Sequence, residues 1–126
     1  VWSLTQAFAP ALKANGGGAV LNVLSVLSWV TLPGLVPYSA SKAAAWALSN
    51  GLRADLREQG TQVTSLHVGY MDTDMTKGVD GPKSSPDDVA RYALAELEAG
   101  AVEVLADDIS RQVKQSLSSA TPAYAG

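Results

Sequence analysis

Apolar residues along the chain form two kinds of segment. In one kind they recur every three or four residues, as on one face of a helix, and in the other they form short continuous runs rich in β-branched residues, which is typical of strands buried on both faces. The helical pattern predicts helices at Val1–Ala14, Tyr38–Gln59 and Ser85–Gly100, and a last one from Asp107 or Asp108 to about Leu117. A run of the second kind predicts a strand at Ala19–Leu24, and we expect a second apolar strand at Gln62–Val68 and a third strand at Val102–Leu105.

Glycine, proline and capping residues mark the connections between these elements. The segment Ser85-Pro86-Asp87-Asp88 is a helix start, with serine at the cap, proline in the first turn and acids beside it. The segment Gly16-Gly17-Gly18 ends a helix and enters a strand. A phosphate-binding loop has the opposite placement, so these glycines are predicted to form a turn. The breakers in Ser25–Pro37 and Gly69–Ser84 predict irregular segments.

Strands that alternate with helices indicate parallel pairing through right-handed crossovers. The expected fold is therefore α/β, a partial doubly wound, Rossmann-like sheet of three parallel strands with flanking helices. We find no internal repeat and no long linker, so residues 1–126 are predicted to form one unit. Ligands of such sheets bind at the carboxyl ends of the strands. The residues after Leu24 and after Val68 are therefore the first candidates for a site.

Composition excludes several classes of function. The 126 residues contain 9 basic and 12 acidic side chains, and the basic ones are scattered rather than clustered, which argues against a nucleic-acid partner. There is no cysteine and only one histidine, His67, so thiol chemistry and a metal site of several histidines are excluded. No G-x-S-x-G segment marks a serine hydrolase. With no apolar run of membrane length and no signal peptide, we expect a soluble, cytoplasmic protein.

Three side chains point to proton transfer. Tyr38 and Lys42 are four residues apart and share one face of a helix, about 5–6 Å apart at Cβ. Positive charge beside a phenol favours the phenolate, which makes the tyrosine usable as an acid and base. Ser25 follows the first strand and could hydrogen-bond a substrate oxygen. Alone, each residue has an ordinary interpretation: a turn serine, a tyrosine at a helix start and a solvated lysine.

The three residues together are more informative than each alone. The segments Asn22-Val23-Leu24-Ser25 and Tyr38-Ser39-Ala40-Ser41-Lys42 resemble the active-site region of the short-chain dehydrogenase/reductase family, in which Tyr-x-x-x-Lys follows a catalytic serine at this spacing. The resemblance implies that Ser25 polarises the substrate oxygen, and that Tyr38 transfers the proton and also contacts the cofactor. It implies that Lys42 assists the tyrosine and binds the nicotinamide ribose. It also implies an oxidoreductase that moves a hydride between NAD or NADP and a small carbonyl or alcohol substrate.

A second segment is similar to the same family. His67-Val68-Gly69-Tyr70-Met71-Asp72-Thr73 resembles the family's Pro-Gly-x-x-x-Thr segment, which implies that Gly69 and Thr73 bind the nicotinamide carboxamide. Val68 stands where the family usually has proline, so a less rigid turn is expected. We interpret His67 as a strand-end residue near the site. Trp2, Trp29 and Trp46 are interpreted as core or subunit-contact residues.

The resemblance runs from Val1 to about Leu117 and corresponds to the C-terminal, catalytic half of the family's domain. The dinucleotide-binding loop and the catalytic asparagine of the family would precede residue 1. We therefore expect a fragment that is inactive by itself, and the choice between NAD and NADP stays open. The family also implies a homo-oligomer in which the helices Val1–Ala14 and Tyr38–Gln59 contact their copies. The alternative is a non-catalytic α/β remnant that serves as an interaction or assembly module.

Overall fold

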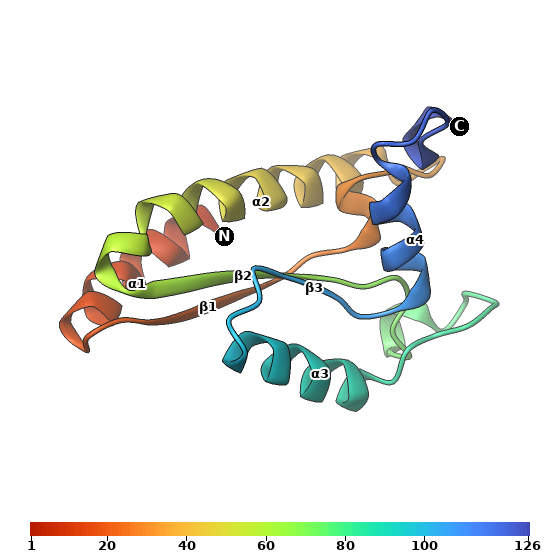
Figure 1. Ribbon diagram of the computed structural model, residues 1–126. Coiled ribbons are helices and arrows are strands. Elements are labelled where there is room, and N and C mark those ends of the chain that lie inside the picture. Colours follow the sequence, from red (N-terminus) through yellow and green to blue (C-terminus); the bar gives the residue numbers. More distant parts are fainter.

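Three parallel strands form one sheet in the computed structural model, which describes residues 1–126 (Figure 1). The strands are β1 (Gly18–Val23), β2 (Thr61–His67) and β3 (Glu103–Leu105), in the spatial order β1-β2-β3. Val20 pairs with Val63, and Ser65 pairs with Glu103. The predicted α/β class and the three-stranded parallel sheet are confirmed.

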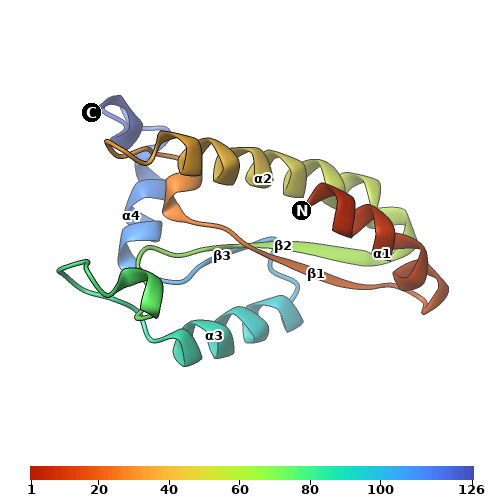
Figure 2. The same ribbon diagram turned by 180° about the vertical axis from the view of Figure 1, so that it is seen from behind.

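Helices cover both faces of this sheet. They are α1 (Trp2–Ala14), α2 (Val36–Asp55), α3 (Pro86–Glu98) and α4 (Asp108–Ser116). Figures 1 and 2 show α1 and α2 side by side on one face and α3 on the other, while α4 stands at the end of the sheet. Single turns of 3₁₀-helix lie at Val26–Ser28, Arg57–Gln59, Asp74–Thr76 and Ala123–Ala125. No helix is both long enough and apolar enough to cross a membrane.

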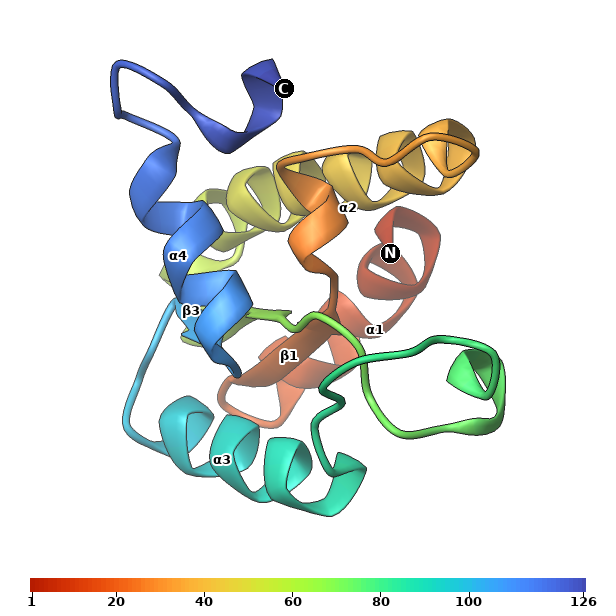
Figure 3. The same ribbon diagram turned by 90° about the vertical axis from the view of Figure 1, so that its right-hand side faces the viewer.

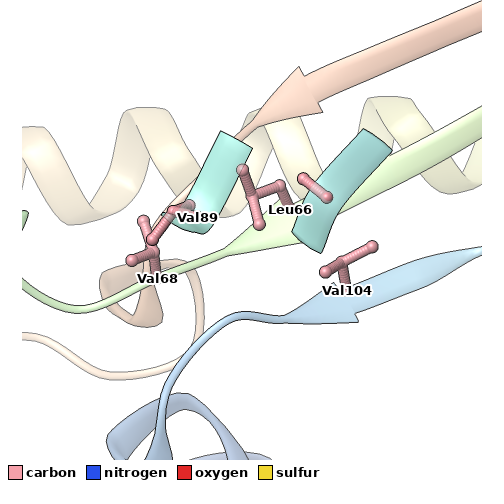
Figure 4. Close-up of a cluster of buried hydrophobic side chains, with 5 residues drawn as sticks. Leu66, Val68, Val89 and Val104 are labelled. Carbon is pink, nitrogen blue, oxygen red and sulfur yellow. The ribbon is translucent and has the colours of Figure 1, made fainter. Parts of the chain in front are cut away.

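The core lies on the two faces of the central strand β2. One cluster joins the sheet to α3 and contains Leu66, Val68, Val89, Ala93 and Val104 (Figure 4). A second cluster on the opposite face contains Ala9, Leu52, Leu56 and Val63. A third, at the carboxyl end of the sheet, contains Val26, Leu27, Trp29 and Val113. Both faces of β2 are buried, although only Val63 and Leu66 among its seven residues are apolar; Thr61, Thr64, Ser65 and His67 are buried polar residues.

The second helix differs from its predicted bounds at both ends. It begins at Val36 rather than Tyr38, because Pro37 lies in the first turn, where a helix needs no backbone N–H. Pro37 is therefore part of a helix start and not a breaker. The α-helix ends at Asp55 rather than Gln59, and a 3₁₀ turn continues to Gly60, whose φ is 72°.

The predicted caps and turn are present. The Ser85 hydroxyl accepts a hydrogen bond from the Asp88 N–H at 3.4 Å, and an Asp107 carboxylate oxygen accepts one from the Ser110 N–H at 2.9 Å. Gly17 has a φ of 113°, and a Cβ there would clash with the carbonyl oxygen of Gly60. These glycines thus allow two turns to touch at the amino end of the sheet, away from the candidate site.

Two apolar features have no partner within the chain. In α1 only Thr5 and Ala9 are buried, whereas Trp2 and Phe8, on the predicted apolar face, are exposed. Strand β1 pairs with β2 along one edge, and its other edge has no strand beside it. Trp2 is therefore not part of the core of this chain, and its interpretation as a subunit-contact residue stays a prediction.

Candidate functional site

The carboxyl ends of the strands meet at one edge of the sheet, because all the strands are parallel. Figure 3 looks at this edge, with the orange turn after β1, the green loop after β2 and the blue helix α4 after β3. These segments, with the start of α2, surround a cavity of about 660 Å³. All the residues predicted for the site line it: Ser25, Tyr38, Lys42, Gly69 and Thr73.

Ser25 is held by the continuation of the sheet beyond β1. The N–H of Leu24 donates to the Leu66 carbonyl at 2.8 Å, and the N–H of Val26 donates to the Val68 carbonyl at 3.1 Å. The Ser25 hydroxyl oxygen accepts a hydrogen bond from the Leu27 N–H at 3.1 Å and caps the 3₁₀ turn that follows. One acceptor position of the hydroxyl is thereby filled, and its hydrogen remains to be donated.

Tyr38 and Lys42 lie in the first turns of α2. The Lys42 ammonium donates to the carbonyl of Val23, the last residue of β1, at 3.0 Å. It also lies 5.6 Å from the centroid of the Tyr38 ring. Lys42 therefore ties the start of α2 to the end of β1 and keeps a positive charge beside the phenol. Tyr38 itself is partly open to solvent.

Gly69 contacts the cap of α4. Its N–H donates to an Asp107 carboxylate oxygen at 2.7 Å. A Cβ at this position would lie 2.7 Å from Cγ2 of Ile109 and 3.1 Å from the same carboxylate oxygen. Only a residue without a side chain fits between the end of β2 and the start of α4. Asp107 was expected as a helix cap, but its contact with Gly69 was not.

Thr73 lies in the loop after β2, where it is exposed and extended, with φ −138°. Its N–H donates to the Thr76 hydroxyl at 3.2 Å. That hydroxyl in turn donates to the Met71 carbonyl. The loop thus satisfies its own polar groups locally while it presents Thr73 and Met71 to the cavity.

A buried polar cluster behind the site was not predicted. His67, which is fully buried, lies 3.1 Å through Nδ1 from the Ser25 carbonyl oxygen and 3.5 Å through Nε2 from a Glu103 carboxylate oxygen. Because a carbonyl oxygen can only accept, Nδ1 carries the hydrogen in the first contact. The imidazole stacks on Trp29, with ring centroids 3.8 Å apart and an interplanar angle of 18°. His67 therefore holds the backbone of Ser25 through Nδ1, whereas Nε2 has no hydrogen-bond partner and forms an ion pair with Glu103 of β3 only when the imidazole is protonated.

Glu103 is the anion of this cluster. Its carboxylate accepts a hydrogen bond from the Trp46 indole at 3.2 Å and pairs with the Lys114 ammonium at 2.6 Å. Burial raises the pKa of the Glu103 carboxyl, but the hydrogen bonds and positive charge of His67 and Lys114 outweigh it and lower the pKa to about 2. Lys114 also lies over the rings of Trp29 and Trp46, at 5.0 and 5.5 Å from their centroids. Trp29 is thus a core residue, one of the two predicted alternatives, and Trp46 is partly buried against the same cluster.

The chain is similar to known dehydrogenases in sequence. A family model described as short chain dehydrogenase matches residues 1–83. Gluconate 5-dehydrogenase of Gluconobacter oxydans is 36% identical over 77 residues, which cover 61% of this chain and 30% of that protein. The 1-deoxy-11-beta-hydroxypentalenate dehydrogenase of Streptomyces exfoliatus is 36% identical over 107 residues, which cover 83% of this chain and 38% of that protein.

A solved structure of a dehydrogenase is similar to this chain in fold as well as in sequence. A short chain dehydrogenase from Burkholderia cenocepacia, in complex with NADP, superposes with a TM-score of 0.88 at 41% identity and covers 94% of this chain. The chain spans 51% of that protein's length and about a third of the length of the two curated relatives. The similarity therefore concerns part of a longer domain in each of these proteins.

Proposed function

The chain belongs to the short-chain dehydrogenase family, and we propose that it is the catalytic, C-terminal half of an NAD(P)-dependent oxidoreductase. Its reaction would move a hydride between the nicotinamide and a carbonyl or alcohol carbon of a small molecule. The observation that carries the proposal is the single cavity that Ser25, Tyr38 and Lys42 line together, although they come from the end of one strand and the start of a helix.

In this proposal Tyr38 moves the proton. The Tyr38 hydroxyl donates its proton to the substrate oxygen during reduction, and the Tyr38 phenolate takes the proton of the alcohol during oxidation. The positive charge of Lys42, 5.6 Å from the ring, stabilises the phenolate that remains after donation. Ser25 holds the substrate oxygen: because the Leu27 N–H fills an acceptor position on its hydroxyl, the hydroxyl hydrogen is left for the substrate.

The residues present fit the nicotinamide end of a dinucleotide. A bound nicotinamide cofactor supplies or accepts the hydride. Lys42 uses one N–H on the Val23 carbonyl, so two remain for the hydroxyls of a ribose. The Gly69 N–H is already taken by Asp107, so Gly69 can offer only its carbonyl oxygen and a close approach of the backbone. Thr73 adds a hydroxyl at the same cavity.

The proposal extends to assembly. The exposed apolar residues of α1, including Trp2, Leu4 and Phe8, together with Leu48 of α2, offer more apolar surface than a solitary chain needs. We expect them to be covered in a homo-oligomer of the complete protein. Sedimentation at micromolar concentration checks this, and a clean monomer would remove the expectation.

The decisive experiment measures reduction of carbonyl compounds by the complete protein that carries residues 1–126, with NADH and NADPH. Tyr38→Phe removes one hydroxyl and should lower kcat by about 10²–10⁴-fold, the usual contribution of general acid–base transfer. Tyr92→Phe is the matched control, because Tyr92 lies on α3 outside the cavity and both tyrosines are 42% exposed. Equal activities of the two variants would overturn the proposal.

A further inference from the structure

The wall of the cavity contains a single charged side chain, Lys42. Of its 20 lining residues, 13 have wholly apolar side chains and two more are the tyrosines Tyr38 and Tyr70, and none is an acid, an amide, a histidine or an arginine. The ammonium of Lys42 already donates to the Val23 carbonyl and lies beside Tyr38. The proposed mechanism also assigns this ammonium to the cofactor. No cation among the residues that line this cavity is therefore left to bind an anionic group on a substrate.

Most polar side chains of the wall are also committed: Thr73 is assigned to the cofactor in the proposed mechanism, and the Tyr70 hydroxyl is the one that has no assigned role. Ser25 and Tyr38 act on the reacting oxygen in the proposed mechanism. The Thr76 hydroxyl donates to the Met71 carbonyl and accepts from the Thr73 N–H. A polyhydroxylated substrate needs a polar partner for each buried hydroxyl, because burying one without a partner is costly. This wall has too few free partners for a sugar.

Apolar side chains reach the cavity from every segment that surrounds it. Leu27 and Val30 come from the segment after β1, and Ile109 and Val113 come from α4. Met75 comes from the loop after β2 and is 88% exposed, although it borders the cavity. An unbranched thioether adapts to ligands of different shapes, and an apolar ligand beside Met75 would cover a side chain that is otherwise in water.

We propose that the substrates are uncharged ketones or secondary alcohols with a bulky apolar body, and not sugar acids or phosphorylated compounds. This inference rests on the proposed function and narrows it to one chemical class. The cavity of about 660 Å³ lies in the usual range of ligand pockets and has to hold the nicotinamide end of the cofactor together with the substrate. Specificity then comes from the desolvation cost of charged or polyhydroxylated competitors, which this wall does not compensate.

The test compares three ketones with the complete protein and its preferred cofactor: 2-decalone, butanone and 5-ketogluconate. We expect kcat/KM for 2-decalone to exceed that for 5-ketogluconate by on the order of a hundredfold or more, because an unpaired carboxylate and several unpaired hydroxyls are rejected strongly. A higher kcat/KM for 5-ketogluconate would overturn the substrate class and leave the proposed function standing. Reduction of none of the three would overturn the proposed function and this inference with it.

A pair of arginine variants tests whether the cavity itself makes the choice. Met75→Arg adds a cation at the cavity, whereas Leu94→Arg adds the same charge on α3, at an exposed apolar residue outside the cavity. Met75→Arg should lower the ratio of kcat/KM for 2-decalone to that for 5-ketogluconate by about tenfold or more, and Leu94→Arg should leave the ratio unchanged. Partial misfolding cancels in a ratio measured on one variant. Equal ratios in the two variants would overturn the inference.

Discussion

His67 lies between the carbonyl of Ser25 and the carboxylate of Glu103, with Nδ1 3.1 Å from the carbonyl oxygen and Nε2 3.5 Å from a carboxylate oxygen. The two partners are 42 residues before and 36 residues after it in the sequence. The Ser25 carbonyl also accepts from the Ser28 N–H at 2.9 Å, so the peptide that carries the proposed catalytic serine is fixed from two sides. This link makes the position of Ser25 depend on the end of β2 and on β3.

Two substitutions of His67 separate its contacts. In His67→Asn the side-chain amide can replace the Nδ1 donor, and in His67→Gln the amide falls nearer the position of Nε2. We expect His67→Gln to lower kcat by about fivefold to tenfold relative to His67→Asn, because a buried carbonyl loses one of its donors. Both variants lose the stacking on Trp29, so their unfolding midpoints should be similar. Equal kcat values would show that His67 does not act through Ser25.

Lys42 is tested by its charge. Lys42→Ala should lower turnover and move the pH optimum of turnover upward, because the phenolate of Tyr38 loses its positive neighbour. Lys42→Arg keeps the charge and should keep the pH optimum closer to that of the native protein. The measurement is kcat against pH for all three proteins. Identical profiles would show that the lysine has no influence on the tyrosine.

The ionisation of Glu103 should make the free energy of unfolding depend on pH. Its pKa is lowered from 4.5 to about 2, so the stabilisation from its ion pair is complete above pH 4.5 and is lost as the pH falls toward 2. Glu103 is 21% exposed, so most of this effect should persist in water. Urea unfolding should show that the free energy of unfolding falls between pH 6 and pH 3. We expect this fall to be about 2 kcal/mol smaller in Glu103→Gln than in the native protein. Parallel curves would contradict the role of this carboxylate.

A side chain at position 69 should destabilise the protein by a steric clash. Gly69→Ala places a Cβ 2.7 Å from Cγ2 of Ile109 and should cost about 1–3 kcal/mol of stability. The double variant Gly69→Ala/Ile109→Ala should recover part of the loss, because the clashing methyl is gone. Gly78→Ala is the control, since its Cβ would meet nothing within 4 Å. Additive losses in the double variant would show that the two residues are not in conflict.

The order and type of the elements were predictable from the sequence, because each follows from a local pattern. The first strand was predicted at Ala19–Leu24 and lies at Gly18–Val23, and the caps Ser85 and Asp107 were identified from their residue types. The error at Pro37 is also local: proline was taken as a breaker, although it is favoured in the first turn of a helix.

The cluster around His67 could not be predicted, because it depends on the pairing of β2 with β3. Ser65 pairs with Glu103, and this register places Glu103 beside His67. The contact of Gly69 with Asp107 likewise joins the ends of two strands. The spacing of these residues along the sequence does not indicate that they are in contact. The five predicted site residues were found by resemblance to a family, and the cavity that they share became visible only in three dimensions.

The 126-residue chain by itself should bind NAD and NADP no better than millimolar and show no dehydrogenase activity. Its proposed contacts reach only the nicotinamide end, and the adenosine and phosphates would contribute nothing toward the entropy of association. Calorimetry with each cofactor measures this, with the complete protein as the control. Micromolar binding by the 126 residues would show that the rest of the domain is unnecessary for cofactor recognition.

Met75 stands in solvent at the border of the cavity, in a chain that contains no cysteine. A cysteine introduced at this one position would be the only thiol in these 126 residues, and a polarity-sensitive dye attached to it would sit where an apolar ligand arrives. Its emission would then report ligand entry directly, without turnover. The feature that leaves Met75 uncovered thus makes this loop a natural place for an optical sensor.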